Sequence, residues 1–242
     1  MPTGVIINSA AIFLGGIFGG LWGHIIPQRL KIELNNIFGV CSMGMGISSI
    51  VLMKNMPAVI LAVVLGTAIG ILFHVGDGIN RTGYYMQGIV SKLPFSSSQT
   101  LSDQEFMLNL VTVIVLFCAS GTGIYGSLDS GISGDATILI SKSILDFFSA
   151  AIFAANLGLV VSLIAVPQFI IFIALFLLAH IIVPLTTPSM IADFKACGGF
   201  LMIATGFRII KVKMFPTADM IPAMLFVMPF SWFWTNIVTS FL

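Results

Sequence analysis

The sequence predicts an all-α integral membrane protein, a polytopic bundle of about eight transmembrane helices, and three observations carry this prediction. Hydrophobic residues make up 58% of the 242-residue chain and charged residues only 8%, against about 25% in a soluble domain. The mean hydropathy is +1.11. The apolar residues also gather in runs of about 20, the length of helix that crosses a bilayer. A soluble core of this size cannot enclose so much apolar surface, so the lipid bilayer must cover the rest.

The charges and cysteines exclude several other classes of protein. The net charge is +1, and the ten Lys and Arg residues form no basic stripe, so we expect no nucleic-acid partner. Cys41, Cys118 and Cys197 lie in apolar runs, without the spacing of a metal or redox site. We therefore expect neither a metal nor a cofactor. The N-terminus has no basic n-region and no A-x-A site, which predicts an uncleaved first span.

Eight runs qualify as spans, and turn-forming residues mark some of their ends. Pro57 and Pro188 suit the first turn of a helix, where the missing N–H costs nothing. Thr187 is a suitable N-cap for the second of these helices. The predicted spans are 4–24, 35–53, 57–75, 106–120, 135–164, 167–184, 188–210 and 219–240.

The first span carries glycines in the pattern GGxxGGxxG, from Gly15 to Gly23. Glycines at this spacing form a smooth strip on one face of a helix, where the backbone of another helix can approach closely. Close helix packing is the main interpretation. The strip also leaves a homodimer open as an alternative.

Some segments between the spans do not cross the membrane in this prediction. Residues 25–34 form an interfacial link. Residues 77–93 carry apolar and charged side chains on opposite sides at helical spacing, which predicts a helix lying in the interface and ended by Pro94. The serine-rich residues 96–102 are predicted as a loop, and residues 102–105 form a capping box that starts the next helix.

The segment from Ser120 to Asp135 breaks the apolar pattern on both sides of it. The apolar run 106–120 covers only roughly 22 Å as a helix, short of the roughly 30 Å hydrocarbon core. Five glycines lie between Gly121 and Gly134. They favour a flexible, non-helical backbone that completes the crossing or folds back as a re-entrant segment. A plain exposed outer loop is the alternative.

Short matches between the two ends of the chain predict an inverted repeat. They pair spans 1–3 (repeat A, about 4–76) with spans 6–8 (repeat B, about 167–240), around a central insert at about 106–164, all in one transmembrane domain. A competing match would pair span 1 with span 5, because Ser9–Phe13 is identical to Ser149–Phe153. The matches that support the repeat are His24–Pro27 with His180–Pro184, Gly39 and Gly46 with Gly199 and Gly206, and Met56–Ala58 with Ile221–Ala223.

The basic residues predict the orientation in the membrane, since cytoplasmic loops carry an excess of Lys and Arg. With the N-terminus outside, the outer loops hold Lys54, and Lys142 and Lys195 fall in adjoining helix starts. We therefore expect both termini on the outer side of the membrane. The residues that the inner loops then hold are Arg29, Lys31, Arg81, Lys92, Arg208, Lys211 and Lys213.

Span 5 carries a polar stripe on an otherwise apolar helix. Counted from Asp135, the side chains of Lys142, Asp146, Ser149 and Asn156 fall within about 80° of one another. Asp146 would lie roughly 16 Å along the helix, about halfway across the core, where a charge costs about 2.5–3.5 kcal/mol. Lys142 at i−4 can be its partner. The stripe predicts an ion or proton site on a polar path. The alternative is a structural Lys–Asp pair that holds helices or a dimer together.

The Gly-rich segment is the second part of the predicted site. A broken helix can bind an anion at a half-helix N-terminus and a cation at its carbonyl groups. In the loop alternative, Asp129 is a solvated acid and Asp135 a helix cap. The residues proposed to hold an ion or solute with the stripe are Ser120, Gly121, Thr122, Gly123, Asp129 and Asp135.

A protease remains a remote alternative. Gly131–Gly134 has the G-x-S-G form of rhomboid intramembrane proteases, and Ser133 and His180 would both lie near the outer face. The glycine expected after the histidine is absent, because Val183 takes its place. We therefore expect that the chain is not an enzyme.

Five motifs in order carry a resemblance to a known family. They are ASGTGIYGSL (119–128), GISGD (131–135), LISKSILDFF (139–148), ACGGFLMIATGFRI (196–209) and MIPAMLFVMPFS (220–231). Together they resemble the YqgA-like family of bacterial inner-membrane proteins, over nearly the whole chain. The resemblance implies a multi-pass protein of the cytoplasmic membrane. It implies no catalytic residues, because the family is one of unknown function, at most described as a candidate transporter.

These observations favour one function and leave one main alternative. The first is a transporter or channel for an ion or small polar solute, with Asp146 and Lys142 as the coupling groups. The alternative is a membrane scaffold or sensor in which the same pair is structural. Transport predicts a wet cavity that reaches Asp146, whereas a scaffold predicts a dry, packed pair.

Overall fold

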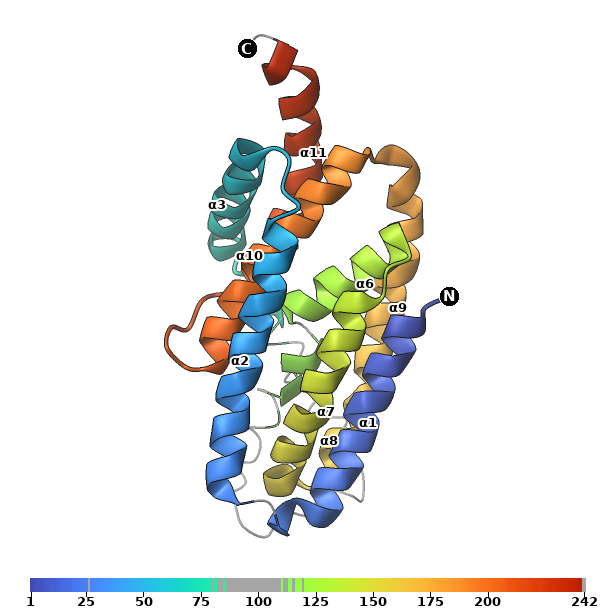
Figure 1. Cartoon of the computed structure of the whole chain (residues 1–242), viewed down its shortest axis with the longest axis vertical. Helices are drawn as coiled ribbons and strands as arrows, with labels where there is room; N and C mark the ends of the chain where they lie inside the picture. Colours follow the sequence, from blue (N-terminus) through green and yellow to red (C-terminus); the bar gives the residue numbers. More distant parts are fainter. Residues whose placement is uncertain are drawn as a thin grey trace.

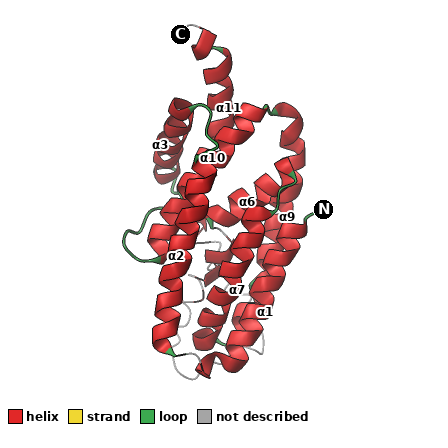
Figure 2. Cartoon of the chain, in the orientation of Figure 1, coloured by secondary structure: helices red, strands yellow, loops and turns green. Residues whose placement is uncertain are grey.

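A computed structural model of the chain describes residues 1–25, 27–79, 81, 85, 110, 113–114, 116–118 and 120–240. Every regular element in these ranges is a helix (Figure 2), which confirms the all-α prediction. The longer helices run roughly along the long axis of the molecule (Figure 1). The described helices are α1 (Thr3–Trp22), α2 (Gln28–Ile50), α3 (Met56–Leu72), α6 (Gly121–Ser133), α7 (Thr137–Leu157), α8 (Val160–Leu163), α9 (Ala165–Ile182), α10 (Pro188–Ile209) and α11 (Ala223–Asn236), with short 3-10 turns η1 (Gly23–Ile25), η2 (Val183–Leu185) and η3 (Val238–Ser240).

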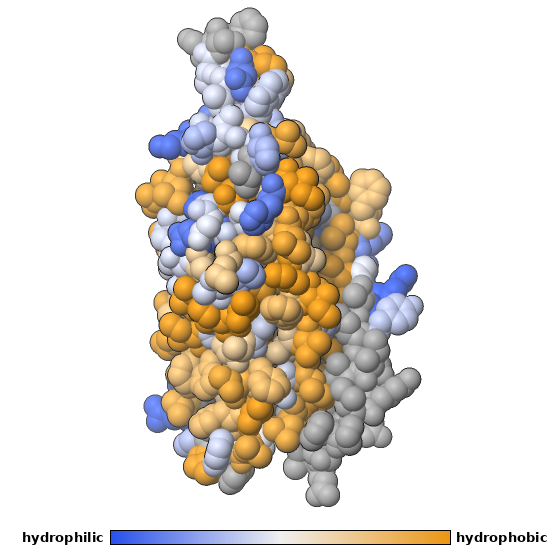
Figure 3. Space-filling view, turned by 90° about the vertical axis from the view of Figure 1, so that its right-hand side faces the viewer, coloured by the Kyte–Doolittle hydropathy of each residue, from blue (hydrophilic) through white to orange (hydrophobic). Residues whose placement is uncertain are grey.

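Four of the described helical stretches are long and apolar enough to cross a bilayer. They are α1, α7, the stretch Val160–Ile181 that joins α8 and α9, and α10. α3 is equally apolar but has only 17 residues. Figure 3 shows apolar residues over most of the face in view. Lipid rather than water is the solvent that fits such a surface.

Three predicted boundaries are wrong. Pro27 is extended and α2 begins directly after it, so most of the predicted link 25–34 is helix. The predicted span 135–164 is interrupted at Gly158, whose φ of 80° ends α7 before α8 begins. Turns precede Ala223, so α11 is shorter than the predicted span 219–240.

Several predicted elements cannot be compared with the structure. Most of the interfacial helix 77–93, the loop 96–102 and the capping box 102–105 lie outside the described residues, as does most of the predicted span 106–120.

The glycine strip of α1 packs inside the chain. A Cβ on Gly15 would lie 2.2 Å from the carbonyl oxygen of Phe147, and one on Gly19 would lie 1.9 Å from that of Ala151, both in α7. Gly16 approaches Ser162 of α8 in the same way, at 2.6 Å from its Cα. Close helix packing is therefore confirmed, and the strip is not a free face for a homodimer.

Glycines also join α2 to α10, and they do so reciprocally. A Cβ on Gly46 would lie 2.6 Å from the carbonyl oxygen of Gly199, and one on Gly199 would lie 2.6 Å from that of Gly46. Gly39 and Gly206 approach each other's carbonyl oxygens at 2.8 and 2.6 Å. The residue numbers rise on one helix as they fall on the other, so α2 and α10 are antiparallel.

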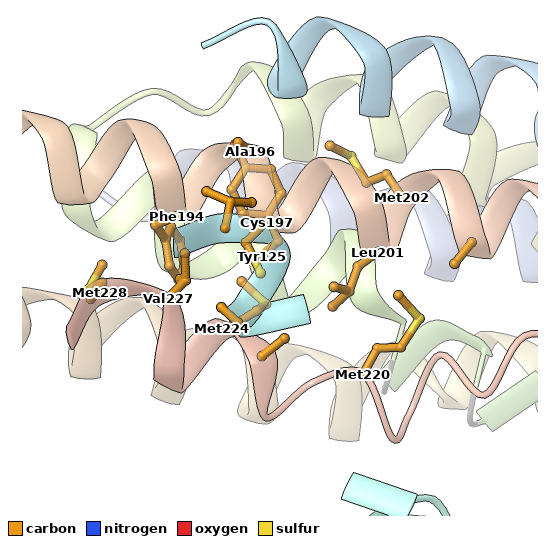
Figure 4. Packing of buried hydrophobic residues seen from close by; sticks show 14 of the residues in the cluster. Tyr125, Phe194, Ala196, Cys197, Leu201, Met202, Met220, Met224, Val227 and Met228 are labelled. Carbon is orange, nitrogen blue, oxygen red and sulfur yellow. The ribbon is translucent and has the colours of Figure 1, made fainter. Parts of the chain in front are cut away.

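Three apolar clusters hold the described helices together, and the smallest joins α1, α7 and α9. Of the two larger clusters, one is formed by α1, α7, α8 and the helical residues around Phe117. The other fills the space between α3, α6, α10 and α11. In Figure 4, Phe194, Cys197, Met224 and Val227 gather around Tyr125 of α6.

Candidate ion-pair site

The predicted pair on span 5 forms in α7. Lys142 and Asp146 are one helical turn apart, and the Lys142 ammonium is bonded to Asp146 Oδ2. Their side chains are only 5% and 9% exposed. A contact between the two residues is therefore confirmed, and both charges are removed from the surface of the chain.

Two amide side chains hold this pair in place, and the sequence interpretation missed both. Asn8 Nδ2 of α1 donates to Asp146 Oδ2 at 2.8 Å, and Gln168 Nε2 of α9 donates to Asn8 Oδ1 at 2.7 Å. Ser9 Oγ donates to Gln168 Oε1 at 2.6 Å. A hydrogen-bonded chain therefore links α7, α1 and α9. The sequence does contain one indication of the role of Asn8 and Gln168. Each is an amide side chain in an apolar run, and a buried amide needs a hydrogen-bond partner.

The packing of α1 against α7 places Asn8 and Asp146 at the same level in the helix bundle. Gly4 of α1 lies against Leu139, and Gly15 lies against Phe147, so α1 and α7 are parallel. Asn8 falls between these two contacts and therefore lies beside Asp146. Tight approach at the glycines brings the two backbones close enough for the short Asn8 side chain to reach the carboxylate.

The pair is incompletely hydrogen-bonded within the described part of the chain. An ammonium has three N–H donors, yet Asp146 Oδ2 is the one described acceptor for Lys142. The ring of Phe117 lies near it, with its centroid 5.9 Å from the ammonium nitrogen. Among the described residues, Asp146 Oδ1 accepts no hydrogen bond. As far as the described residues go, the site is electrically neutral, with two donors on Lys142 and one acceptor atom on Asp146 that have no described partner.

The Gly-rich segment is an ordered helix, so the predicted non-helical backbone and the alternative of an exposed loop are both wrong. Ser120 caps α6 by accepting a hydrogen bond from the N–H of Gly123 at 3.1 Å. The glycines serve close packing: a Cβ on Gly123 would lie 2.2 Å from the ring of Phe172, and one on Gly131 would lie 2.5 Å from Ala179 Cβ. Gly134, with φ 74°, ends the helix. The segment is neither a non-helical backbone nor an exposed loop.

Asp129 of α6 forms a second buried acid–base pair. Its Oδ1 lies 3.1 Å from the Lys195 ammonium of α10 and accepts a bond from Ser133 Oγ at 3.1 Å. The side chain of Asp129 is 3% exposed, so it is not the solvated acid of the loop alternative. This pair joins α6 to α10, whereas Lys142 and Asp146 share one helix.

The other predicted site residues are distributed along α6 and α7. Asp135 is exposed at the start of α7, where its Oδ1 accepts bonds from the backbone and hydroxyl of Thr137 at 2.9 and 2.6 Å. Thr122 is buried, Ser149 is half-buried and Asn156 is exposed. The structure therefore brings the deep part of the stripe into one cluster, but not its two ends.

The residues of the protease alternative bond within their own helices. Ser133 Oγ lies 2.9 Å from the carbonyl oxygen of Asp129 and His180 Nδ1 lies 3.0 Å from that of Phe176. Among the described hydrogen bonds, none joins Ser133 to His180. The described residues also hold no group of three or more His, Cys, Asp or Glu side chains that could bind a metal.

Asp193 is a further buried acid that the sequence interpretation missed. It lies in α10 and accepts bonds from the backbone N–H groups of Lys54 and Asn55 at 2.7 and 2.9 Å. Asn55 Nδ2 and Ser231 Oγ donate to its other oxygen at 2.9 and 2.6 Å. Because both oxygens are satisfied, Asp193 fixes the link between α2 and α3 to α10 and α11.

Comparison with known proteins gives a family but no activity. A family model described as "Protein of unknown function (DUF554)" matches residues 3–232. "Uncharacterized protein YqgA" of Escherichia coli (strain K12) is 46% identical over 97% of this chain and 98% of its own length. "Uncharacterized membrane protein YdfK" of Bacillus subtilis (strain 168) is 25% identical over 92% of each chain. No solved structure matches. The resemblance based on five motifs is confirmed.

Proposed function

Because the chain belongs to the DUF554 family of unknown function, its activity has to be argued from its own residues, and we propose that it transports or conducts an ion or small polar solute. The observation that carries the proposal is the Lys142–Asp146 pair, buried between apolar helices and tied to two of them through Asn8 and Gln168. Ionisable groups at membrane depth are costly, and they commonly mark the path of an ion or a proton.

The proposal includes eight crossings of the bacterial cytoplasmic membrane with both termini outside. The distribution of Lys and Arg supports this orientation. Helix directions support it as well, since α1 and α7 would be spans 1 and 5 and they run parallel. Ser162 and Leu159 pack against Gly16 and Gly20, so the chain there runs opposite to α1, as span 6 should.

An inverted repeat is part of the same proposal. One shift of 160 residues relates Gly39 to Gly199, Gly46 to Gly206 and Asn8 to Gln168. Under this shift the Gly39–Gly206 contact becomes the Gly199–Gly46 contact, as a two-fold axis between α2 and α10 requires. The hydrogen bond between Asn8 and Gln168 joins two further equivalent positions. Transporters built from such repeats bind their substrates where the repeats meet.

We further propose that α6 is the outer half of a discontinuous span. Its 13 residues cover only about 20 Å. It follows the helical residues 116–118 after an extended Ser120, and Phe117 of this preceding stretch lies beside Lys142. The break therefore falls next to the ion pair, and the start of α6 offers Ser120, Gly121, Thr122 and Gly123 to a solute.

A flux measurement in proteoliposomes tests the proposed function. Sodium, potassium, chloride and phosphate are screened first, and any flux is compared between the wild type and Asp146→Asn. We expect the variant to fall to the level of protein-free liposomes, because it lacks the charge that the path uses. Asp135→Asn is the matched control, an exposed acid near the start of the same helix, and it should keep its flux. Equal flux in Asp146→Asn and wild type would refute the site.

The scaffold or sensor remains a second candidate, favoured by the burial of the pair. A scaffold predicts a dry, packed pair, and a transporter predicts a wet cavity that reaches Asp146. The side chains of the pair are 5% and 9% exposed, which agrees with the scaffold prediction. For a transporter, we infer that a pair buried to this extent corresponds to an occluded state, closed to water on both sides. A scaffold keeps its interactions when the pair is replaced by neutral side chains, whereas a transporter loses flux. A homodimer would need a face other than the strip on α1.

A further inference from the structure

We propose, resting on the transport function above, that the species moved is a small anion together with one proton. Protonation of Asp146 releases Lys142, and the freed ammonium then holds the anion. Three features of the described site support this: the identity of its charges, the direction of its hydrogen bonds and the burial of its cation.

The site is unsuited to a metal cation. Asp146 Oδ2 already accepts bonds from the Lys142 ammonium and from Asn8 Nδ2, so both described partners present hydrogens to it. A hard cation takes about six oxygen ligands, and the pair offers one carboxylate oxygen to which no described residue is bonded. The ammonium already occupies the place of the cation, and it would repel a second one.

Lys142 is suited to hold an anion once Asp146 is neutral. It is 4% exposed, and its described contacts are the Asp146 carboxylate and the face of the Phe117 ring. Two of its three N–H donors have no described acceptor. A buried ammonium without a counter-charge is strongly unfavourable, so protonation of Asp146 creates a demand for an anion. Conversely, an ionised Asp146 repels the anion, so proton and anion bind cooperatively.

Within the described part of the chain, Asp146 is the one carboxylic acid in contact with Lys142. Asn8 and Ser9 face the pair from α1 and Gln168 faces it from α9, and none of these side chains titrates. The stretch before α6 contributes the Cys118 thiol, which interacts electrostatically with both members of the pair. α2 meets α7 through Phe38 and Phe148. Asp129 of α6 and Lys195 of α10 pair with each other rather than with this site.

The charge balance gives the mechanism a measurable signature. A proton from water on one side binds a carboxylate oxygen of Asp146 and is returned to water on the other side, and the anion takes the same route on Lys142. One proton and one monovalent anion move no net charge. Flux of chloride or nitrate should therefore acidify the liposome lumen without depending on an imposed membrane potential.

The inference can be tested by binding alone, in detergent. Infrared difference spectra detect the carbonyl stretch of a protonated carboxyl group, and we expect one such band in the wild type that Asp146→Asn lacks. Because the anion binds the protonated form, raising chloride or nitrate should move the titration midpoint of this band to higher pH. At saturating anion, the movement approaches about one pH unit per tenfold rise in concentration. Exchanging sodium for a large organic cation should change nothing.

Two variants show where the effect arises. Lys142→Met keeps a side chain of similar length and removes the cation, so Asp146 should stay protonated and its band should lose all dependence on anions. Asp135→Asn should keep both the band and its movement. The proposal is overturned if no band depends on Asp146, if chloride and nitrate leave the midpoint where it was, or if sodium lowers it. Anion-linked titration without any flux would instead contradict the transport function and leave the binding inference standing.

Discussion

Asn8 connects the ion pair to the rest of the bundle, since it donates to Asp146 Oδ2 and accepts from Gln168. At the scale of single residues, the chemistry of the amide group explains this connection. An amide can donate and accept at once, so one short side chain links three helices. Removing it leaves Gln168 Nε2 without its described acceptor and leaves the Lys142 ammonium as the one described donor to Asp146 Oδ2.

Asn8→Ala should therefore lower stability by about 1–3 kcal/mol, since it leaves the buried amide N–H of Gln168 without its described acceptor and removes one of the two bonds to Asp146 Oδ2. Thermal unfolding in detergent measures the loss. Ser143→Ala is the control, because that hydroxyl is equally buried but bonds only to the carbonyl of Leu139 in its own helix. Equal effects of the two substitutions would contradict the bridging role of Asn8.

Asp135 predicts a dependence of stability on pH. Hydrogen bonds from the hydroxyl and backbone of Thr137 hold the pKa of the Asp135 carboxyl below its ordinary value. Its stabilising effect is therefore fully present above the pKa of the unfolded chain, about 3.9, and is lost as pH falls through the lower folded pKa. Asp135→Ala should cost about 0.5–1 kcal/mol near neutral pH, a small value because the group is exposed. Unfolding curves at a series of pH values measure the difference in stability between the wild type and Asp135→Ala, which should vanish in acid. A difference that is the same at every pH would show that the ionised Asp135 carboxylate does not stabilise the fold.

At the scale of the helix, glycines decide which backbones meet. α1 lies against α7 and α8 through one strip, α2 lies against α10 through reciprocal pairs, and α6 lies against α9 through Gly123 and Gly131. The same residue type at three interfaces explains why the helices approach closely enough for short polar side chains to bridge them.

Gly46 and Gly44 provide a test within one helix. A Cβ on Gly46 would lie 2.6 Å from the carbonyl oxygen of Gly199, whereas one on Gly44 would meet nothing within 4 Å. Gly46→Ala should therefore push α2 and α10 apart and destabilise by about 1–3 kcal/mol. Gly44→Ala should stabilise by up to about 1 kcal/mol, because alanine favours the helix. Unfolding midpoints that move in the same direction would contradict the packing described here.

The limits of sequence interpretation are also clearest at this scale. Lys142 and Asp146 could be paired in advance because an i, i+4 contact lies within one helix. Asn8 and Gln168 could not, since their partners lie 138 and 160 residues away in the chain. The Gly-rich segment was misjudged because glycine permits both a loop and a closely packed helix, and the presence of Phe172 beside Gly123 decides between them.

At the scale of the whole molecule, the proposed two-fold relation and the orientation depend on each other. An inverted repeat requires repeat A and repeat B to enter the membrane from opposite sides, and the Lys and Arg distribution predicts an outside N-terminus. Eight crossings then return the C-terminus to the same side.

Fusions at the two termini test this arrangement in bacteria. Alkaline phosphatase, which is active only outside the cytoplasm, should be active at both ends of the chain. A green fluorescent reporter that folds in the cytoplasm should remain dark at both. Activity of the two reporters on opposite ends would require an odd number of crossings and would rule out the eight-span proposal.

The most direct test of the central claim compares single and double substitutions of the ion pair. Lys142→Met or Asp146→Leu alone should destabilise by about 3–5 kcal/mol, since each leaves a buried charge or polar group unpaired. The double variant should recover most of this stability, because neither charge remains. If the pair moves a solute, the folded double variant should show no flux in proteoliposomes. A double variant that is stable and transports as well as the wild type would contradict the account and leave Lys142 and Asp146 as structural residues.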